Sequence, residues 1–170
     1  MPMSKTFKSK REIILGIDPG LADTGYGLIS KNGTRINLIA YGCITTSKTK
    51  LLPQRLKEIK ESLTQIIKKH KPSQLSLEQL FFCKNVKTAL IIGQVRGIII
   101  LTATENNLPI FEFTPLQVKQ AITSYGRADK KQIQEMVKRL LNLKTCPYPD
   151  DAADALAIAI CCAQTNLNLI

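Results

Sequence analysis

The 170 residues, 44% hydrophobic and 22% charged, fit one folded domain with a full core and exclude a disordered chain. The net charge of +11, from 24 Lys and Arg against 13 Asp and Glu, favours a polyanion such as nucleic acid; a merely basic, soluble surface is the alternative. The five Cys have no Cys-x-x-Cys spacing and indicate neither a disulfide framework nor a zinc site. No segment has the pattern of a membrane span or a signal peptide. We therefore expect a reduced, cytoplasmic protein.

The first predicted strand ends in a carboxylate that an apolar strand does not explain. Residues 13–17 form a short β-branched run, Asp18 follows, and Pro19 and Gly20 then turn the chain. Residues 25–29 read as the return strand of a hairpin. Asp18 is either an acid that caps the turn or an acid displayed on a rigid sheet for chemistry, and this stretch alone favours neither.

The next elements repeat this strand-end pattern. Residues 36–45 alternate as a third strand, so the predicted sheet opens as an antiparallel meander. Helical spacing then runs from near Pro53 to before Pro72. A strand over 74–78 follows and ends in Glu78. Because a helix that returns to a parallel strand keeps it in the same sheet, we expect Glu78 to lie beside the first strand-end acid.

A long apolar helix is predicted over 86–106, with Gly93 and Gly97 four residues apart. Small residues at this spacing allow another helix to approach closely, and the partner is either the helix that precedes Pro72 or a second subunit. A short strand over 109–113 and a helix over 115–123, which carries Lys119, come next.

A basic turn precedes the following helix. Asp129 is the expected N-cap, and Lys130 and Lys131 lie near the helix start, where the helix dipole disfavours cations. A phosphate partner explains these two lysines, and so does a solvated turn.

The closing helix, over 149–163, is apolar nearly all round and is predicted to be buried. Asp150 or Asp151 is explained as its cap, but Asp154 lies one turn inside and is surrounded by Ala. Asp151 and Asp154 are three residues apart and share one face of the helix. Buried acids of this kind need cations.

Four carboxylates therefore stand out, at two strand ends and on one helix face: Asp18, Glu78, Asp151 and Asp154. Oxygen ligands without His or Cys suit Mg²⁺ or Mn²⁺ rather than zinc. Two such ions in one site activate a water and stabilise the leaving oxygen of a phosphodiester.

Two adjacent aromatics, Phe81 and Phe82, follow Glu78 directly. Both cannot point into the core from one short loop, so we expect one of them to be exposed beside the acids, where nucleic-acid bases stack on such rings. The alternative is one core Phe and one Phe at its rim.

The chain resembles the RuvC family of crossover junction endodeoxyribonucleases, within the ribonuclease-H-like superfamily, over nearly everything after residue 12. The resemblance rests on several separate motifs in the family's order: residues 16–20 with 24–27, 78–85, 93–97, 117–120 and 151–157. It implies an α/β ribonuclease-H-like mixed sheet, three antiparallel strands and then parallel strands, flanked by helices. We expect a single nuclease domain over 11–165, between a basic tail over 1–10, which has no counterpart in the family, and a C-terminal tail over 166–170.

The family implies a Holliday junction resolvase. Such an enzyme is a homodimer that binds a four-way DNA junction, nicks opposing strands at T-rich sites and leaves ends that ligase can seal, in recombination and repair alongside a branch-migration helicase complex. Matched by position, the catalytic and metal-binding acids are Asp18, Glu78, Asp151 and Asp154, with Mg²⁺ as cofactor, Mn²⁺ as its substitute and two ions per site. The expected DNA contacts are Phe81, Lys84, Lys119, Lys130 and Lys131.

The resemblance also assigns Arg96 and the Gly93–Gly97 face to the helix that pairs the subunits. Asp150 has no assigned role and is interpreted as a cap, while Phe82 and Cys83 are bulkier than expected beside a stacking Phe. Two other hypotheses remain. One is a nucleotide-binding kinase-like domain, against which the short chain and the lack of a second phosphate loop argue. The other is a junction-binding module without catalysis, which would require a lost acid.

Overall fold

The computed structural model describes residues 11–79 and 86–165, which form a five-stranded mixed sheet with helices on both faces. The strand order is β3-β2-β1-β4-β5. The strands are β1 (Glu12–Asp18), β2 (Asp23–Asn32), β3 (Arg35–Thr45), β4 (Gln74–Glu78) and β5 (Ile110–Phe113). The first three pair antiparallel, whereas β4 pairs parallel with β1 and β5 pairs parallel with β4. The predicted meander and the parallel return of β4 beside β1 are confirmed.

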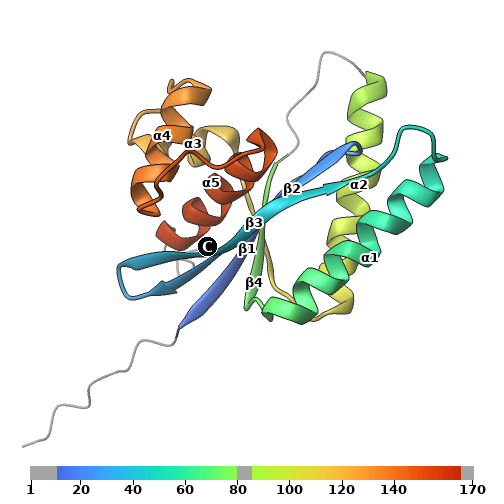
Figure 1. Cartoon of the computed structure of the whole chain (residues 1–170), viewed down its shortest axis with the longest axis horizontal. Helices are drawn as coiled ribbons and strands as arrows, with labels where there is room; N and C mark the ends of the chain where they lie inside the picture. Colours follow the sequence, from blue (N-terminus) through green and yellow to red (C-terminus); the bar gives the residue numbers. More distant parts are fainter. Residues whose placement is uncertain (1–10, 80–85, 166–170) are drawn as a thin grey trace, which may run out of the picture.

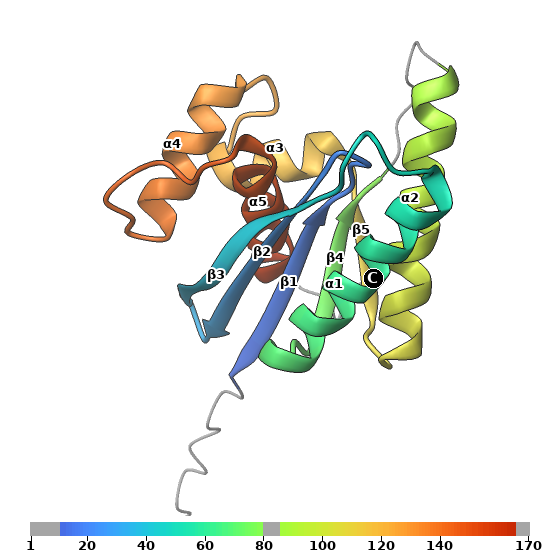
Figure 2. The same cartoon turned by 45° about the vertical axis from the view of Figure 1, so that its right-hand side comes forward.

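The described helices lie on both faces of the sheet (Figures 1 and 2). On the first face lie α1 (Leu52–His70) and α2 (Val86–Glu105). On the second lie α3 (Pro115–Thr123), α4 (Lys130–Leu140) and α5 (Asp150–Gln164). On this second face α5 packs directly on the strands, and α3 and α4 pack on α5. Each face has its own buried core, because successive residues of a strand point to opposite sides. On β1, for example, Ile14 packs toward α5, and Leu15 packs toward α1 and α2.

The central helix α5 lies very close to β1 and β2 because glycines face it. A methyl group at Gly16 would lie 2.1 Å from the carbonyl oxygen of Ala155, and one at Gly25 would lie 2.0 Å from that of Asp151. The alanines of α5 complete this contact, and Ala152, Ala153, Ala155 and Ala159 are fully buried. The small residues bring the first turn of α5 to the end of β1, since Gly25 is paired with Asp18.

Helix α2 is the most apolar of the described helices. Within the described residues it is long and apolar enough to cross a membrane by length and composition, with a mean hydropathy of 1.6, so the expectation that no segment reaches that length was wrong. One side of α2 packs on α1 and the core, with Val95 and Ile99 fully buried. A methyl group added at Gly93 or Gly97 would meet no atom within 4 Å. Helix α1 therefore does not cover the glycine face.

Candidate active site

Strand alternation places the two strand-end acids on the face covered by α5. On β4, Gln74 donates to the Cys162 sulfur at 3.4 Å and Ser76 donates to the Ile158 carbonyl at 3.5 Å, so even-numbered side chains of this strand point toward α5. Ile17 and Leu77 are paired neighbours, and the next residue on each strand is a carboxylate. Asp18 and Glu78 thus stand side by side at the carboxyl ends of two parallel strands, as the sequence predicted.

The first turns of α5 bring two more acids to this strand edge. Asp151 and Asp154 are half-buried residues of that helix, and both repel the carboxylate of Asp18. Asp18, Glu78 and Asp154 line one cavity of about 260 Å³ together with Lys119 of α3. The remaining walls are largely apolar, with Val118, Ile133 and Ile158 among them. The fold therefore gathers three of the four predicted acids, from three elements, around one hollow. Asp151 is not among the residues that line it, but it lies close enough to Asp18 to raise the pKa of that carboxylate.

Burial and mutual repulsion raise the pKa of three of these acids, Asp18, Glu78 and Asp154. Burial first, and then the carboxylates of α5 and Glu78, raise the pKa of Asp18 to about 7. The pKa of Glu78 is raised by burial and by Asp154, although Lys119 and Arg96 act to lower it. The pKa of Asp154 is raised mainly by burial, against the pull of Lys130. A site that disfavours its own negative charge is one that favours a bound cation.

A lysine of α4 lies against the acids on the outer side. The Lys130 Nζ is 3.3 Å from Asp154 Oδ2 and 3.1 Å from Asp150 Oδ2. This ion pair is a third explanation for a lysine at the start of α4, beside the phosphate partner and the solvated turn. Asp129 is the N-cap of α4, as predicted, and its carboxylate accepts from the Gln132 N–H at 2.9 Å.

The interpretation of Asp150 as a cap was wrong. Pro149 is the N-cap of α5, and the structure assigns no side-chain cap bond to this helix start. Asp150 is instead the first helical residue and turns toward α4, where Gln134 donates to its Oδ1 at 2.9 Å. The pKa of Asp150 is lowered by hydrogen bonds from Lys130 and then Gln134.

The chemistry of the four acids suits a hard divalent cation. All donors are carboxylate oxygens, which Mg²⁺ and Mn²⁺ prefer, and the ammonium of Lys130 already binds Asp154 as a cation. Within residues 11–79 and 86–165, however, no three Asp, Glu, His or Cys side chains converge as a ready-made metal group. The acids fit the ion in type and charge, and their mutual repulsion is a physical reason for them to stay apart without one.

The predicted DNA contacts divide into those that the structure places and those that it does not. Lys119 lines the cavity, and Lys130 contacts Asp154. Lys131 is exposed on α4 and is not among the residues that line the cavity. Phe81 and Lys84 lie outside the described residues.

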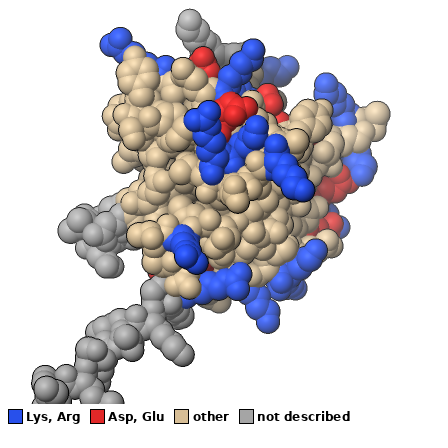
Figure 3. All heavy atoms as spheres, turned by 60° about the vertical axis from the view of Figure 1, so that its left-hand side comes forward, with Lys and Arg blue, Asp and Glu red and all other residues tan. Residues whose placement is uncertain are grey.

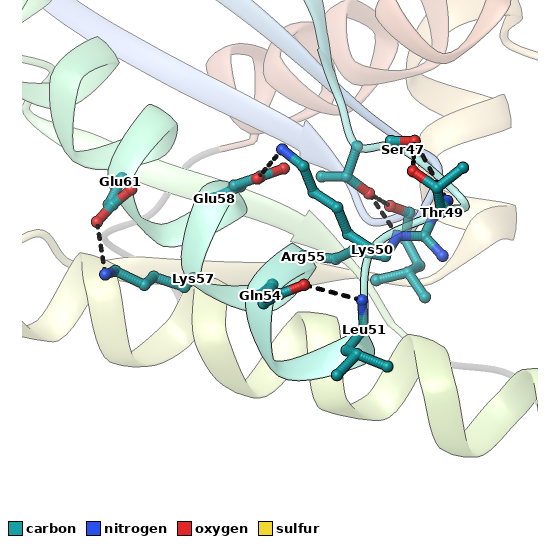
Figure 4. A network of polar contacts seen from close by, with 11 residues as sticks. Ser47, Thr49, Lys50, Leu51, Gln54, Arg55, Lys57, Glu58 and Glu61 are labelled. Atoms are coloured by element: carbon teal, nitrogen blue, oxygen red, sulfur yellow. Dashed lines mark hydrogen bonds and ion pairs between the residues drawn. The ribbon is translucent and has the colours of Figure 1, made fainter.

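Hydrogen bonds anchor the turn that follows Asp18 to α1. Thr46 donates from its hydroxyl to the Leu21 carbonyl at 2.6 Å and from its N–H to the Ala22 carbonyl at 2.9 Å. Arg55 of α1 in turn donates to the Thr46 hydroxyl at 2.8 Å. Figure 4 shows Arg55 within the polar network at the start of α1, where Lys50 also pairs with Glu58. The turn beside the acids is therefore held from the opposite side of the sheet.

Sequence reasoning missed a buried arginine that holds the end of β4. Arg96 of α2 is 8% exposed and donates to the main-chain carbonyl of Glu78 and to the carboxylate of Glu112. It lies on the helix to which the resemblance assigned it, but its side chain points into the sheet. A cation in the middle of an otherwise apolar helix was the available signal.

Comparison with known proteins places the chain in one family. The sequence profile described as crossover junction endodeoxyribonuclease RuvC matches residues 14–162. A protein of that name from Alkaliphilus oremlandii is 57% identical over 154 residues, which cover 91% of this chain and 94% of the relative. The one from Caldicellulosiruptor saccharolyticus is 57% identical over 149 residues, with 87% and 90% covered.

Solved structures show the same fold. Thermus thermophilus RuvC in complex with a Holliday junction substrate has a TM-score of 0.85 at 30% identity, covering 88% of this chain and 92% of that one. The yeast mitochondrial Holliday junction resolvase Ydc2 has a TM-score of 0.65 at 17% identity, covering 94% and 80%, which shows the fold alone. The predicted ribonuclease-H-like mixed sheet is thereby confirmed. The chain belongs to the RuvC family of crossover junction endodeoxyribonucleases.

Proposed function

We infer that this protein is a Holliday junction resolvase, an endonuclease that nicks opposing strands of four-way DNA junctions during recombination and repair. The observation that carries this function is the cavity where Asp18, Glu78 and Asp154 meet Lys119, in a chain of this family. A negative hollow in a protein of net charge +11 suits a phosphodiester held by cations. On the face in Figure 3, Lys and Arg side chains border a small group of acidic ones.

We propose that the reaction depends on Mg²⁺, with Mn²⁺ as a substitute and two ions per site. Asp18, Glu78, Asp151 and Asp154 would hold the ions, which supply an activated water and stabilise the leaving oxygen. The carboxylates orient the reacting groups and compensate the ionic charge. Lys119 and Lys130 lie where they can bind phosphate oxygens, and we assign DNA contact to them and to Lys131, Phe81 and Lys84.

We propose a homodimer that pairs through the uncovered face of α2. Val86 is 70% exposed, Leu90 65% and Leu101 48%, and the two glycines of this helix are open on the same element. An apolar stripe of this kind on a DNA-binding protein suits a second copy, which also supplies the second nick. We place the protein in the cytoplasm with the DNA on which it acts, and we propose branch-migration helicase proteins as its partners.

The test is cleavage of a synthetic mobile four-way junction, with a linear duplex of the same sequence beside it. We expect paired nicks on the junction alone, in Mg²⁺ and not in EDTA. Asp18→Asn should lower the nicking rate by roughly 100-fold or more, the loss expected when a group that acts on transition-state charge is removed, while junction binding persists. Glu61→Gln, an exposed acid of α1 that pairs with Lys57, should leave the rate unchanged.

Full activity of the Asp18→Asn protein would overturn the assignment of the acids. Tight junction binding by the unaltered protein without nicking in any divalent ion would identify a binding module instead of an enzyme.

A further inference from the structure

The ammonium group of Lys130 is shared between an inner and an outer carboxylate of α5. Its Nζ lies 3.3 Å from Asp154, which borders the cavity, and 3.1 Å from Asp150, which faces away from it at the helix start. The Asp154 side chain is 34% exposed and that of Asp150 is 58% exposed. Lys130 thus bridges Asp154, a proposed metal ligand, and Asp150, for which neither the family resemblance nor the proposed metal site gives a role.

Asp150 is fixed in place independently of the lysine. Gln134 donates to Asp150 Oδ1 at 2.9 Å, and Lys130 binds the other oxygen, Oδ2. Lys130 and Gln134 are four residues apart on α4, so both side chains leave the same face of the helix and reach one carboxylate. Asp150 therefore stays beside Lys130 whatever happens at Asp154.

We propose a Lys130 switch, in which the Lys130 ammonium changes its partners when the metal binds and Asp150 is the carboxylate that it keeps. In the metal-free site the ammonium binds both acids, and when a divalent cation binds Asp154 the ammonium keeps Asp150 alone. This inference rests on the proposed metal site. Like charges repel strongly at short range in a half-buried site, so a lysine shared with a metal ligand must withdraw from it or compete with the ion. Asp150 provides an acid to which it can withdraw.

The switch rests on the two contacts of the Lys130 Nζ, 3.1 Å from Asp150 and 3.3 Å from Asp154. Two predictions of opposite sign follow: loss of the lysine removes a competitor of the ion, whereas loss of Asp150 leaves Asp154 as the lysine's remaining acid and strengthens the competitor.

A double-mutant cycle of Mn²⁺ binding tests the switch without DNA or activity. Free Mn²⁺ is measured by electron paramagnetic resonance in titrations of the full chain and of three variants: Lys130→Gln, Asp150→Asn and both together. We expect Lys130→Gln to tighten Mn²⁺ binding about threefold and Asp150→Asn to weaken it by about the same factor, since partly exposed ion pairs contribute this much. The double variant should match Lys130→Gln, because Asp150 acts only through the lysine.

The matched control is Glu135→Gln, which removes an acid from the same helix α4. Glu135 contacts Cys146 and Lys138 rather than the cavity, so its loss should leave Mn²⁺ binding unchanged. Equal weakening by Asp150→Asn with and without Lys130 would mean that Asp150 attracts the ion directly, and it would overturn the switch. So would a Lys130→Gln protein that binds no tighter than the unaltered one.

Failure of the metal site itself has a different signature. If both the unaltered protein and the Lys130→Gln variant are folded and neither binds Mn²⁺, the proposed metal dependence is wrong. The switch, which rests on that metal site, is then wrong as well.

Discussion

Among single residues, Asp18 has an electrostatically unfavourable position and a proposed role in metal binding and catalysis. Its side chain is half-buried at a strand end, and its nearest charged neighbours include three further acids. Its pKa in the folded state, about 7, lies above the ordinary value of 3.8 expected in the unfolded chain. Ionised Asp18 therefore destabilises the metal-free protein, a cost expected where acids are kept together for chemistry rather than for stability.

This pKa predicts how stability depends on pH in EDTA. Below about pH 4, Asp18 carries a proton in both states and contributes nothing. Between that pH and about 7, the unfolded chain loses the proton first, so the contribution of Asp18 to the free energy of unfolding falls as pH rises and then stays constant. The free energy of unfolding of the Asp18→Asn protein should exceed that of the unaltered protein by a margin that grows across this window to roughly a few kcal/mol.

Urea unfolding at pH 5 and pH 8 measures this difference. Mg²⁺ at pH 8 should stabilise the unaltered protein more than the Asp18→Asn protein. A difference between the two proteins that does not change with pH would contradict the raised pKa.

At the scale of elements, the end of β4 depends on α2. Arg96 crosses from the helix to bind the Glu78 carbonyl and the Glu112 carboxylate on the neighbouring strand β5. A buried guanidinium that binds a strand end in this way fixes the backbone from which the proposed catalytic side chain of Glu78 leaves. Helix α2 thus links the proposed dimer surface to the proposed active site.

Arg96→Met should weaken both stability and nicking. Removing one partner of a buried charged pair leaves the Glu78 carbonyl and Glu112 unmatched, and we expect a loss of roughly 1–3 kcal/mol in the free energy of unfolding. The nicking rate should also fall under conditions where circular dichroism shows the variant folded. Lys57→Met, which breaks an exposed pair on α1 with an Nζ–Oε1 distance of 3.7 Å, should cost at most about 1 kcal/mol and spare the rate. An Arg96→Met protein that nicks normally would rule out a positioning role.

At the scale of the whole molecule, the uncovered face of α2 is the feature that one copy leaves unexplained. The opposite side of the helix is buried in the core, while the stripe of Val86, Leu90, Gly93, Gly97 and Leu101 is open. Two active sites on opposing strands need two copies with a defined spacing, and a pairing helix that also holds β4 would set it.

Leu90→Glu combined with Leu101→Glu should therefore yield monomers. Two buried charges without partners disfavour an apolar interface. Analytical ultracentrifugation should show the change in mass, and the junction assay should show loss of paired nicks. Leu51→Glu is the matched control, because Leu51 is 71% exposed at the start of α1, outside the stripe, and its dimer should persist. A dimer that survives both glutamates would place the interface elsewhere.

Local patterns in the sequence were enough to predict the helices and strands and the residue types of the candidate site. Period-two and helical patterns predicted the meander, the parallel return to β4 and the helices, because these signals are local. Asp18, Glu78, Asp151 and Asp154 were recognisable because carboxylates at apolar strand ends and inside an alanine-rich helix have no structural reason to be there.

How closely these parts pack depends on the folded structure. Gly16 and Gly25 look like ordinary residues of a hairpin, and the need for them arises from a helix that comes more than a hundred residues later in the printed sequence. The inward turn of Arg96 and the contact of Asp150 with α4 likewise depend on partners remote in the chain. Local patterns report a residue's periodicity and type, whereas close approach and ion pairing depend on which surfaces the fold brings together.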